Sequence, residues 1–147
     1  MAVLRDRPYS QFNFLVDIGI GDRASAGFQE VSGLSTEVSV IEYRNGNSKE
    51  NSPIKITGLN KATDVTLRRG VIGGLELYGW LNEIRNGSQT ALRTVTIQLL
   101  DEERNVVQSW KLLRTRIVKH TSGPFHARGN DVAVEEIVLA YERLELE

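Results

Sequence analysis

The spacing of hydrophobic residues changes between positions 63 and 87. Val65 and Leu67 alternate with polar neighbours, which is the two-residue period of a half-buried β-strand. Three glycines follow, and the apolar positions then recur at the three- and four-residue spacing of an amphipathic helix. A glycine just after the last periodic residue is a typical helix stop. The pattern therefore predicts a strand that leads into a helix over residues 74–86, whose buried face is formed by Leu77, Leu81 and Ile84.

Most other apolar positions alternate with polar ones, so the rest of the chain is expected to be β. The first such run spans residues 12–20, where every second residue is Phe, Val or Ile. Shorter runs occur at 38–43 and 54–59, and two further runs flank a polar turn at 101–105. The pattern predicts a mainly β protein of the α+β class, a small β-barrel or sandwich with one helix, in a single domain over residues 1–147.

Two predicted strands carry apolar residues on both faces. Apolar neighbours occur at Leu112–Leu113 and Ile117–Val118, and residues 137–141 are apolar throughout. Because a sheet with one face in water shows one polar face, these strands need cover on both sides, and a second subunit is a natural source of it. In the last strand the parity of the apolar residues changes at Glu135–Glu136, which predicts a β-bulge there.

A polar stretch without any apolar residue, 44–53, interrupts the predicted strands. It contains Asn45–Gly46, a pair typical of tight turns. One interpretation is a mobile, solvated hairpin tip, which the composition by itself favours. The other is an arm that becomes ordered only against a neighbouring subunit.

The balance of charge argues against nucleic-acid binding, because 18 basic and 19 acidic side chains leave a formal net charge of −1. The chain of 147 residues has no cysteine, which excludes disulfides and thiolate chemistry. No apolar run is long enough to span a bilayer, and residues 1–8 lack the apolar core of a signal peptide. We therefore expect a soluble chain that is made in the cytoplasm without a cleaved leader.

The sequence contains few side chains that could support catalysis. His120 and His126 fit no metal-binding spacing and are expected in loops. Residues 19–24 match the loose dinucleotide fingerprint G-x-G-x-x-A, but no helix pattern follows, so a turn is the better interpretation. Arg68 and Arg69 are expected on the wet side of a strand. No catalytic, cofactor-binding or metal-binding residue is assigned, no cofactor is expected, and the protein is not expected to be an enzyme.

One series of motifs runs through nearly the whole chain. It consists of F-x-E-V-S-G-L at 28–34, E-Y-R-N-G at 42–46, V-T-L-R-R-G at 65–70, the I-x-L-L-D hairpin at 97–101 with Trp110, and the closing Ile137, Leu139 and Tyr141. In this order the motifs resemble the tail-tube protein family of contractile phages. The similarity is closest to the inner-tube subunits of extracellular contractile injection systems, the phage-tail-like particles of bacteria.

This resemblance implies a six-stranded antiparallel β-barrel or sandwich flanked by one α-helix. Subunits of the family form hexameric rings, the rings stack into a hollow tube, and contraction of a surrounding sheath drives the tube through a target envelope. The implied partners are further copies of the chain, the sheath protein, baseplate, spike and cap proteins, and effector cargo in the lumen. No nucleic acid is required, and a membrane enters only as the target of an extracellular or cell-anchored particle.

The resemblance also implies which residues contact other subunits. Residues 43–60 match the extended loop that reaches the adjacent ring, and the N-terminal segment matches a second ring contact. Two alternatives remain open: a small ligand-binding β-barrel, and the tube protein of a non-contractile tail or a type VI-like apparatus. The implied contact residues are Arg7, Pro8, Tyr9, Glu42, Tyr43, Arg44, Asn45, Gly46, Asn47, Lys49, Glu50, Asn51 and Pro53.

Overall fold

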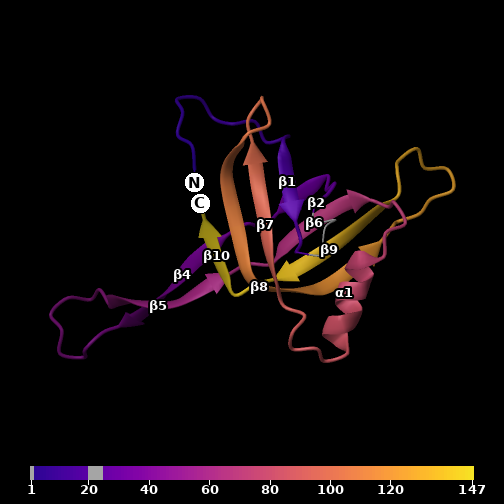
Figure 1. Ribbon diagram of the computed structural model, residues 1–147. Helices are drawn as coiled ribbons and strands as arrows, with labels where there is room; N and C mark the ends of the chain where they lie inside the picture. The colour runs from indigo at the N-terminus through magenta and orange to yellow at the C-terminus, as the bar shows by residue number, and fades with distance from the viewer. Residues whose placement is uncertain (1, 20–24) are drawn as a thin grey trace.

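The computed structural model describes residues 2–19 and 25–147, which form ten strands and one helix (Figure 1). Most of these strands join one sheet in the order β2-β1-β7-β8-β9-β6-β3, β10 adds to β8, and β4 pairs with β5 separately. Every pairing is antiparallel. The elements are β1 (Phe14–Asp17), β2 (Ser25–Ala26), β3 (Glu30–Ser32), β4 (Thr36–Tyr43), β5 (Ile54–Ala62), β6 (Val65–Gly70), α1 (Glu76–Arg85), β7 (Arg93–Leu100), β8 (Val106–Ser122), β9 (Val134–Ala140) and β10 (Arg143–Leu146).

The longest strand, β8, belongs to both layers of the fold. Its first part pairs with β7 and its last part with β9. Between them Arg114 has a positive φ of 52° and the register against β7 shifts, which is the geometry of a bulge that bends a strand. β9 and β10 pair with successive parts of β8. The bent strand therefore carries the sheet from one layer of a sandwich to the other.

The helix α1 packs against β8 and covers one side of the core. Leu77 and Trp80 are buried, and Leu81 and Ile84 pack on the same core with part of their surface exposed. The Trp80 indole N–H donates a hydrogen bond of 2.7 Å to the Ala91 carbonyl oxygen. The predicted buried face of the helix is therefore correct, but the prediction omitted Trp80, the largest side chain on that face.

The predicted fold class, mainly β with one helix, is confirmed in its sandwich form. Within the described residues the strand order ends at β2 and β3 and no ladder joins those two strands, so the barrel is not closed. The first strand begins at Phe14, where its pairing with β7 starts, and Phe12 lies before it and is largely exposed. Ile20 and positions 20–24 of the dinucleotide-like motif lie outside the described residues.

The bulge predicted at Glu135–Glu136 is wrong. β9 keeps one register against β6 through both glutamates, and the irregularity against β8 lies elsewhere, between Ile117 and Lys119. Glu135 is buried in the same row as Ile137, whereas its neighbour Glu136 faces outward. The parity changes because a core-facing position holds a carboxylate, not because the strand contains an extra residue.

Glu135 is buried because a buried arginine lies opposite it. Arg69 of β6 is 1% exposed, forms an ion pair with Glu135, and places its Nη1 2.6 Å from Glu76 Oε1 at the start of α1. Burial by itself would lower the pKa of Arg69, but the bonds to Glu135 and Glu76 raise it above its ordinary value. His120 Nε2 lies 3.0 Å from Glu135 Oε2. Arg69 is therefore not on the wet side of its strand, and His120 lies in β8 and not in a loop.

The buried ion pair predicts a large difference between two neighbouring glutamates. Glu135→Ala should lower the free energy of unfolding by on the order of 3 kcal/mol, because Arg69 then keeps its charge inside the fold with one partner fewer. Glu136→Ala, on the outer face of the same strand, should change it by less than about 1 kcal/mol. Urea denaturation at one protein concentration compares the variants, and equal losses would contradict the assignment.

Candidate assembly interface

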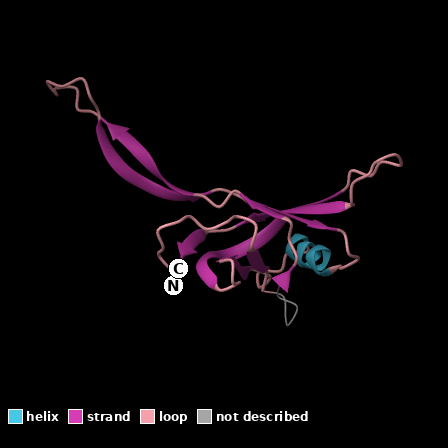
Figure 2. Ribbon diagram, turned by 90° about the horizontal axis from the view of Figure 1, so that it is seen from above, coloured by secondary structure: helices cyan, strands magenta, loops and turns pink. Residues whose placement is uncertain are grey.

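A two-stranded arm, defined here as residues 36–62, projects from the sandwich (Figure 2). It consists of β4 and β5, and every residue of β4 is exposed. The chain passes from β3 into β4 and from β5 into β6, and β3 pairs with β6. The arm therefore prolongs an edge of the sheet beyond the body of the protein.

The arm has apolar side chains on both faces. Ile41 pairs with Ile56, and Tyr43 with Ile54, which places these four side chains on one face. Val38 and Val40 lie on the opposite face of β4, where Glu42 pairs with Lys55. The six apolar side chains are 47–58% exposed. An isolated two-stranded hairpin is marginally stable in water, and this arm exposes apolar side chains on both of its faces.

A bulge in β5 distorts the arm near its base. Three residue steps in β5, from Asn60 to Thr57, lie opposite two steps in β4, from Val38 to Val40. Leu59 lies in this bulge and is 84% exposed. A Cβ at Gly58 would lie 3.0 Å from the Ser39 carbonyl oxygen, so the close approach of the two backbones favours glycine. The irregularity breaks the flat edge that the arm would otherwise present.

The tip of the arm is organised by the Arg44 guanidinium. Its Nε donates to the Glu50 carbonyl oxygen at 3.0 Å, and its Nη2 donates to the Ser48 carbonyl oxygen at 3.1 Å. The Tyr43 hydroxyl donates to Asn45 Oδ1 at 2.7 Å. The predicted contact residues between positions 42 and 53 thus lie together at one end of the arm.

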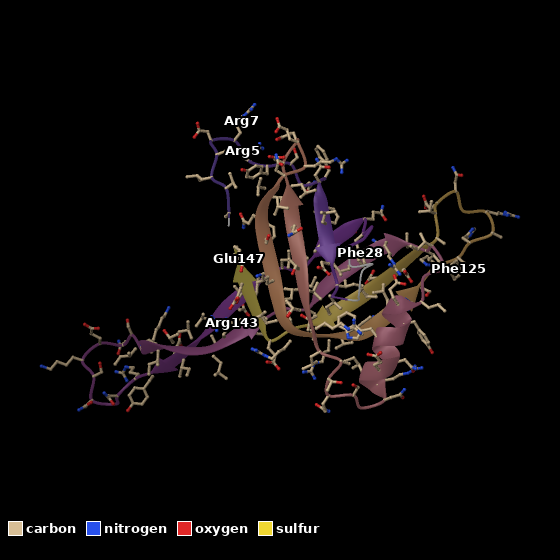
Figure 3. The ribbon with its side chains drawn as sticks, in the orientation of Figure 1. Arg5, Arg7, Phe28, Phe125, Arg143 and Glu147 are labelled. Carbon is tan, nitrogen blue, oxygen red and sulfur yellow. The ribbon has the colours of Figure 1, made fainter. Side chains whose placement is uncertain are left out.

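The N-terminal segment is held by Arg5, whose pairing with Glu102 the sequence reasoning did not predict. Arg5 forms a bidentate pair with Glu102 in the turn between β7 and β8, at 2.8 and 3.1 Å. It also donates to the carbonyl oxygens of Arg7 and Pro8 and stacks over the Tyr9 ring at 3.8 Å. The Arg5 guanidinium thus contacts all three predicted contact residues, Arg7, Pro8 and Tyr9. Figure 3 labels Arg5 and Arg7 in this segment. The sequence signal was an arginine beside an Arg-Pro-Tyr segment, together with an acidic turn.

Two grooves lie on opposite faces of the edge strand β3. The outer groove, of about 750 Å³, lies between β3 and the loop 123–133 and is lined by Glu30, Arg68, Phe125, Asp131 and Val132, among others. The inner groove, of about 580 Å³, opens where the barrel fails to close. It is lined mainly by Phe12, Phe14, Val31, Leu34, Leu99 and Trp110.

No group of three or more potential metal ligands occurs among residues 2–19 and 25–147. Within the same ranges no helix is long and apolar enough to cross a membrane.

The Arg5–Glu102 pair predicts a pH-dependent attachment of the N-terminal segment. The hydrogen bond from Arg5 lowers the pKa of Glu102 from 4.5 to about 2. A lowered pKa means that the attachment is complete above the ordinary value of 4.5 and is lost as the pH falls toward about 2. The Val3 amide, which donates to the Val107 carbonyl oxygen at 2.8 Å, reports on this attachment by NMR.

Glu102→Gln should place the Val3 signal at its detached position at neutral pH and remove the acid transition. Glu103→Gln, in the same turn, is the matched control and should keep the transition. A transition unchanged in Glu102→Gln would contradict the role of this pair.

Comparison with known proteins gives a consistent result. The model of the T4-like virus tail tube protein gp19 family matches residues 10–145. A chain in the extended sheath-tube complex of PVC, an extracellular contractile injection system, is 31% identical, with 95% of this chain and 91% of that chain covered and a TM-score of 0.83. A chain in the tube-terminating cap of the anti-feeding prophage is 28% identical, with 100% and 95% covered and a TM-score of 0.85. These matches confirm the resemblance that the sequence motifs indicated.

A more distant likeness extends to Hcp1 from Flavobacterium johnsoniae, which is 10% identical over 90% of this chain and 94% of that chain, with a TM-score of 0.54. At this identity the likeness shows a common fold alone. No curated protein sequence matches the chain.

Proposed function

The chain belongs to the T4-like virus tail tube protein family, and we propose that it is the inner-tube subunit of a phage-tail-like contractile injection system. Copies of the chain form hexameric rings, and the rings stack into a hollow, rigid tube. Contraction of a sheath drives this tube and its cargo through a target envelope. The role of the subunit is mechanical and not catalytic.

The arm is the observation that carries this proposal. A hairpin with six half-exposed apolar side chains, standing clear of its own body, is suited to an obligate contact between subunits. Obligate interfaces are hydrophobic and bury on the order of 2,000–5,000 Å². A stack of rings supplies such an interface at every subunit.

Two segments make the contacts between rings in this proposal. The arm tip contributes Glu42, Tyr43, Arg44, Asn45, Gly46, Asn47, Lys49, Glu50, Asn51 and Pro53, and the attached N-terminal segment contributes Arg7, Pro8 and Tyr9. The internal hydrogen bonds of both segments support this assignment, because a segment ordered before assembly loses less conformational entropy on binding.

The further partners follow from the similar chains of known structure. Those chains come from a sheath-tube complex, a sheath/tube terminator and a tube-terminating cap. We propose that this subunit likewise meets a sheath protein along the tube, a cap at one end, and baseplate and spike proteins at the other. Effector cargo occupies the lumen, and the particle acts outside the cell that makes it or is anchored to it. The likeness to Hcp1, being one of fold alone, adds no second candidate.

Electron microscopy of the protein, purified alone and co-expressed with a sheath protein from the same genome, tests the proposal. Rings and stacked tubes are expected, and the tubes should lie inside the sheath. A protein that stays monomeric in analytical ultracentrifugation at high concentration, and that is missing from purified particles, would overturn it.

Removal of the arm tip should separate ring formation from stacking. Deletion of residues 45–52 leaves both arm strands and the whole sandwich intact, so rings should form. Stacking should fail, because the tip contacts to the next ring are lost. A Gly-Ser replacement of the same eight positions is the control for loop length, and it should also impair stacking if the side chains matter. Tubes of ordinary length from the deletion would refute the role of the tip.

A further inference from the structure

The tripeptide Arg-Asn-Gly occurs twice in the chain, in two different structural settings. Asn45–Gly46 lies at the tip of the arm, clear of the sandwich (Figure 2), whereas Asn86–Gly87 ends the helix α1. Both asparagines are exposed to solvent. An asparagine followed by glycine is prone to deamidation, because glycine has no side chain to hinder attack by its backbone nitrogen on the asparagine side chain. The two sites share the same local sequence, so a difference in their reactivity has to come from the structure.

The attacking nitrogen is free at the arm tip and occupied at the end of the helix. The Gly87 N–H donates a hydrogen bond of 3.1 Å to the Ile84 carbonyl oxygen in the last turn of α1. The Gly46 N–H has no acceptor within the part of the chain that the structure describes. Attack requires this N–H to lose its proton, and a hydrogen bond inside the protein protects an N–H from water, as it does in hydrogen exchange. Gly46 is therefore ready to react, whereas Gly87 reacts only after the helix end opens.

Two hydrogen bonds at the tip end on the oxygens where negative charge develops during the reaction. The Ser48 N–H donates to the Asn45 carbonyl oxygen at 3.1 Å. This oxygen shares the charge that the peptide group acquires when the Gly46 nitrogen loses its proton. The Tyr43 hydroxyl donates at 2.7 Å to Asn45 Oδ1, the side-chain oxygen that becomes negative when the nitrogen attacks Cγ. Donors placed at a developing oxyanion lower the barrier to its formation.

We propose that Asn45 is a site of spontaneous deamidation that alters the arm tip of subunits not stacked in a tube. The deprotonated Gly46 nitrogen forms a bond to Asn45 Cγ, and the bond from Cγ to the side-chain nitrogen breaks. The side-chain nitrogen takes up the proton and leaves as ammonia. Water then opens the cyclic imide at either of its carbonyl groups and gives aspartate or isoaspartate. Water is the only other reactant.

Deamidation changes both the charge and the backbone of the tip. Either product adds a negative charge next to Arg44, whose guanidinium holds the carbonyl oxygens of Glu50 and Ser48. Isoaspartate also lengthens the main chain by a methylene group. Deamidated subunits should therefore stack poorly, and stacked subunits should be protected, because the tip is then covered. These two consequences rest on the proposed function, whereas the reaction at Asn45 in the free subunit does not.

Peptide mass spectrometry of the ageing protein tests the site, with Asn86 as the control in the same chain. Unstacked protein is kept in mildly alkaline buffer, and asparagine, aspartate and isoaspartate are measured at both positions over time. In the folded subunit Asn45 should convert at least about tenfold faster than Asn86, because Gly87 must first leave its hydrogen bond. In urea, where neither site is structured, the two rates should agree within about twofold. Equal rates in the folded protein, or a faster rate at Asn86, would overturn the proposal.

Two variants test the chemistry at the tip. A Cβ at Gly46 would meet no other atom within 4 Å, so Gly46→Ala should keep the fold. It should slow the conversion of Asn45 about tenfold, because the added side chain hinders the attack. Tyr43→Phe removes the donor to Oδ1 and should slow the conversion several-fold. Both variants should leave the rate at Asn86 unchanged, and an unchanged rate at Asn45 in either variant would contradict this mechanism.

Stacked tubes separate a failure of this proposal from a failure of the proposed function. In purified tubes Asn45 should convert as slowly as Asn86, and subunits that have already converted should be depleted from newly formed tubes. If tubes form but Asn45 converts at the rate of the free subunit, the proposed contact between rings is wrong and the deamidation site stands. If no tubes form, the proposed function fails, and the rates at Asn45 and Asn86 in the unstacked protein still decide the site.

Discussion

A two-stranded sheet cannot bury its own side chains, and this constraint governs the structure. The arm consists of the two strands β4 and β5, and its apolar side chains are exposed to water in the free subunit. The arm continues the paired strands β3 and β6 of the sandwich. The sandwich supplies the base, and the arm is the continuation of its edge.

Buried charge joins the elements next to the arm. Arg69 lies on β6, the strand into which the arm returns, and its partners come from β9 and from the start of α1. Each partner is fixed by the others, since removing any one leaves a charge in a medium that solvates it poorly. Arg69 therefore links β6 to both β9 and α1 at the base of the arm.

Sequence reasoning predicted the architecture well where one physical effect dominated. The strand-to-helix change at residues 63–87, the helix face with Leu77, and the polar tip were all legible from periodicity. It failed at Glu135 and Arg69, because a pair of opposite charges can occupy core positions when each has a partner far away in the sequence. It also missed the pairing of Arg5 with Glu102 and the two grooves at β3, which exist only after distant strands meet. Pairwise chemistry between remote residues leaves little trace in a single sequence.

The exposed arm also sets a condition on how the protein is made. Before assembly, each free subunit exposes an arm with apolar side chains and an unpaired strand edge. Such an edge can pair with an exposed strand of an unrelated protein. The bulge at Gly58 and the charged residues Glu42 and Lys55 weaken non-specific pairing of the arm with other strands. Synthesis of subunits therefore has to keep pace with assembly. An excess of free subunits would aggregate through their arms before adding to a growing assembly.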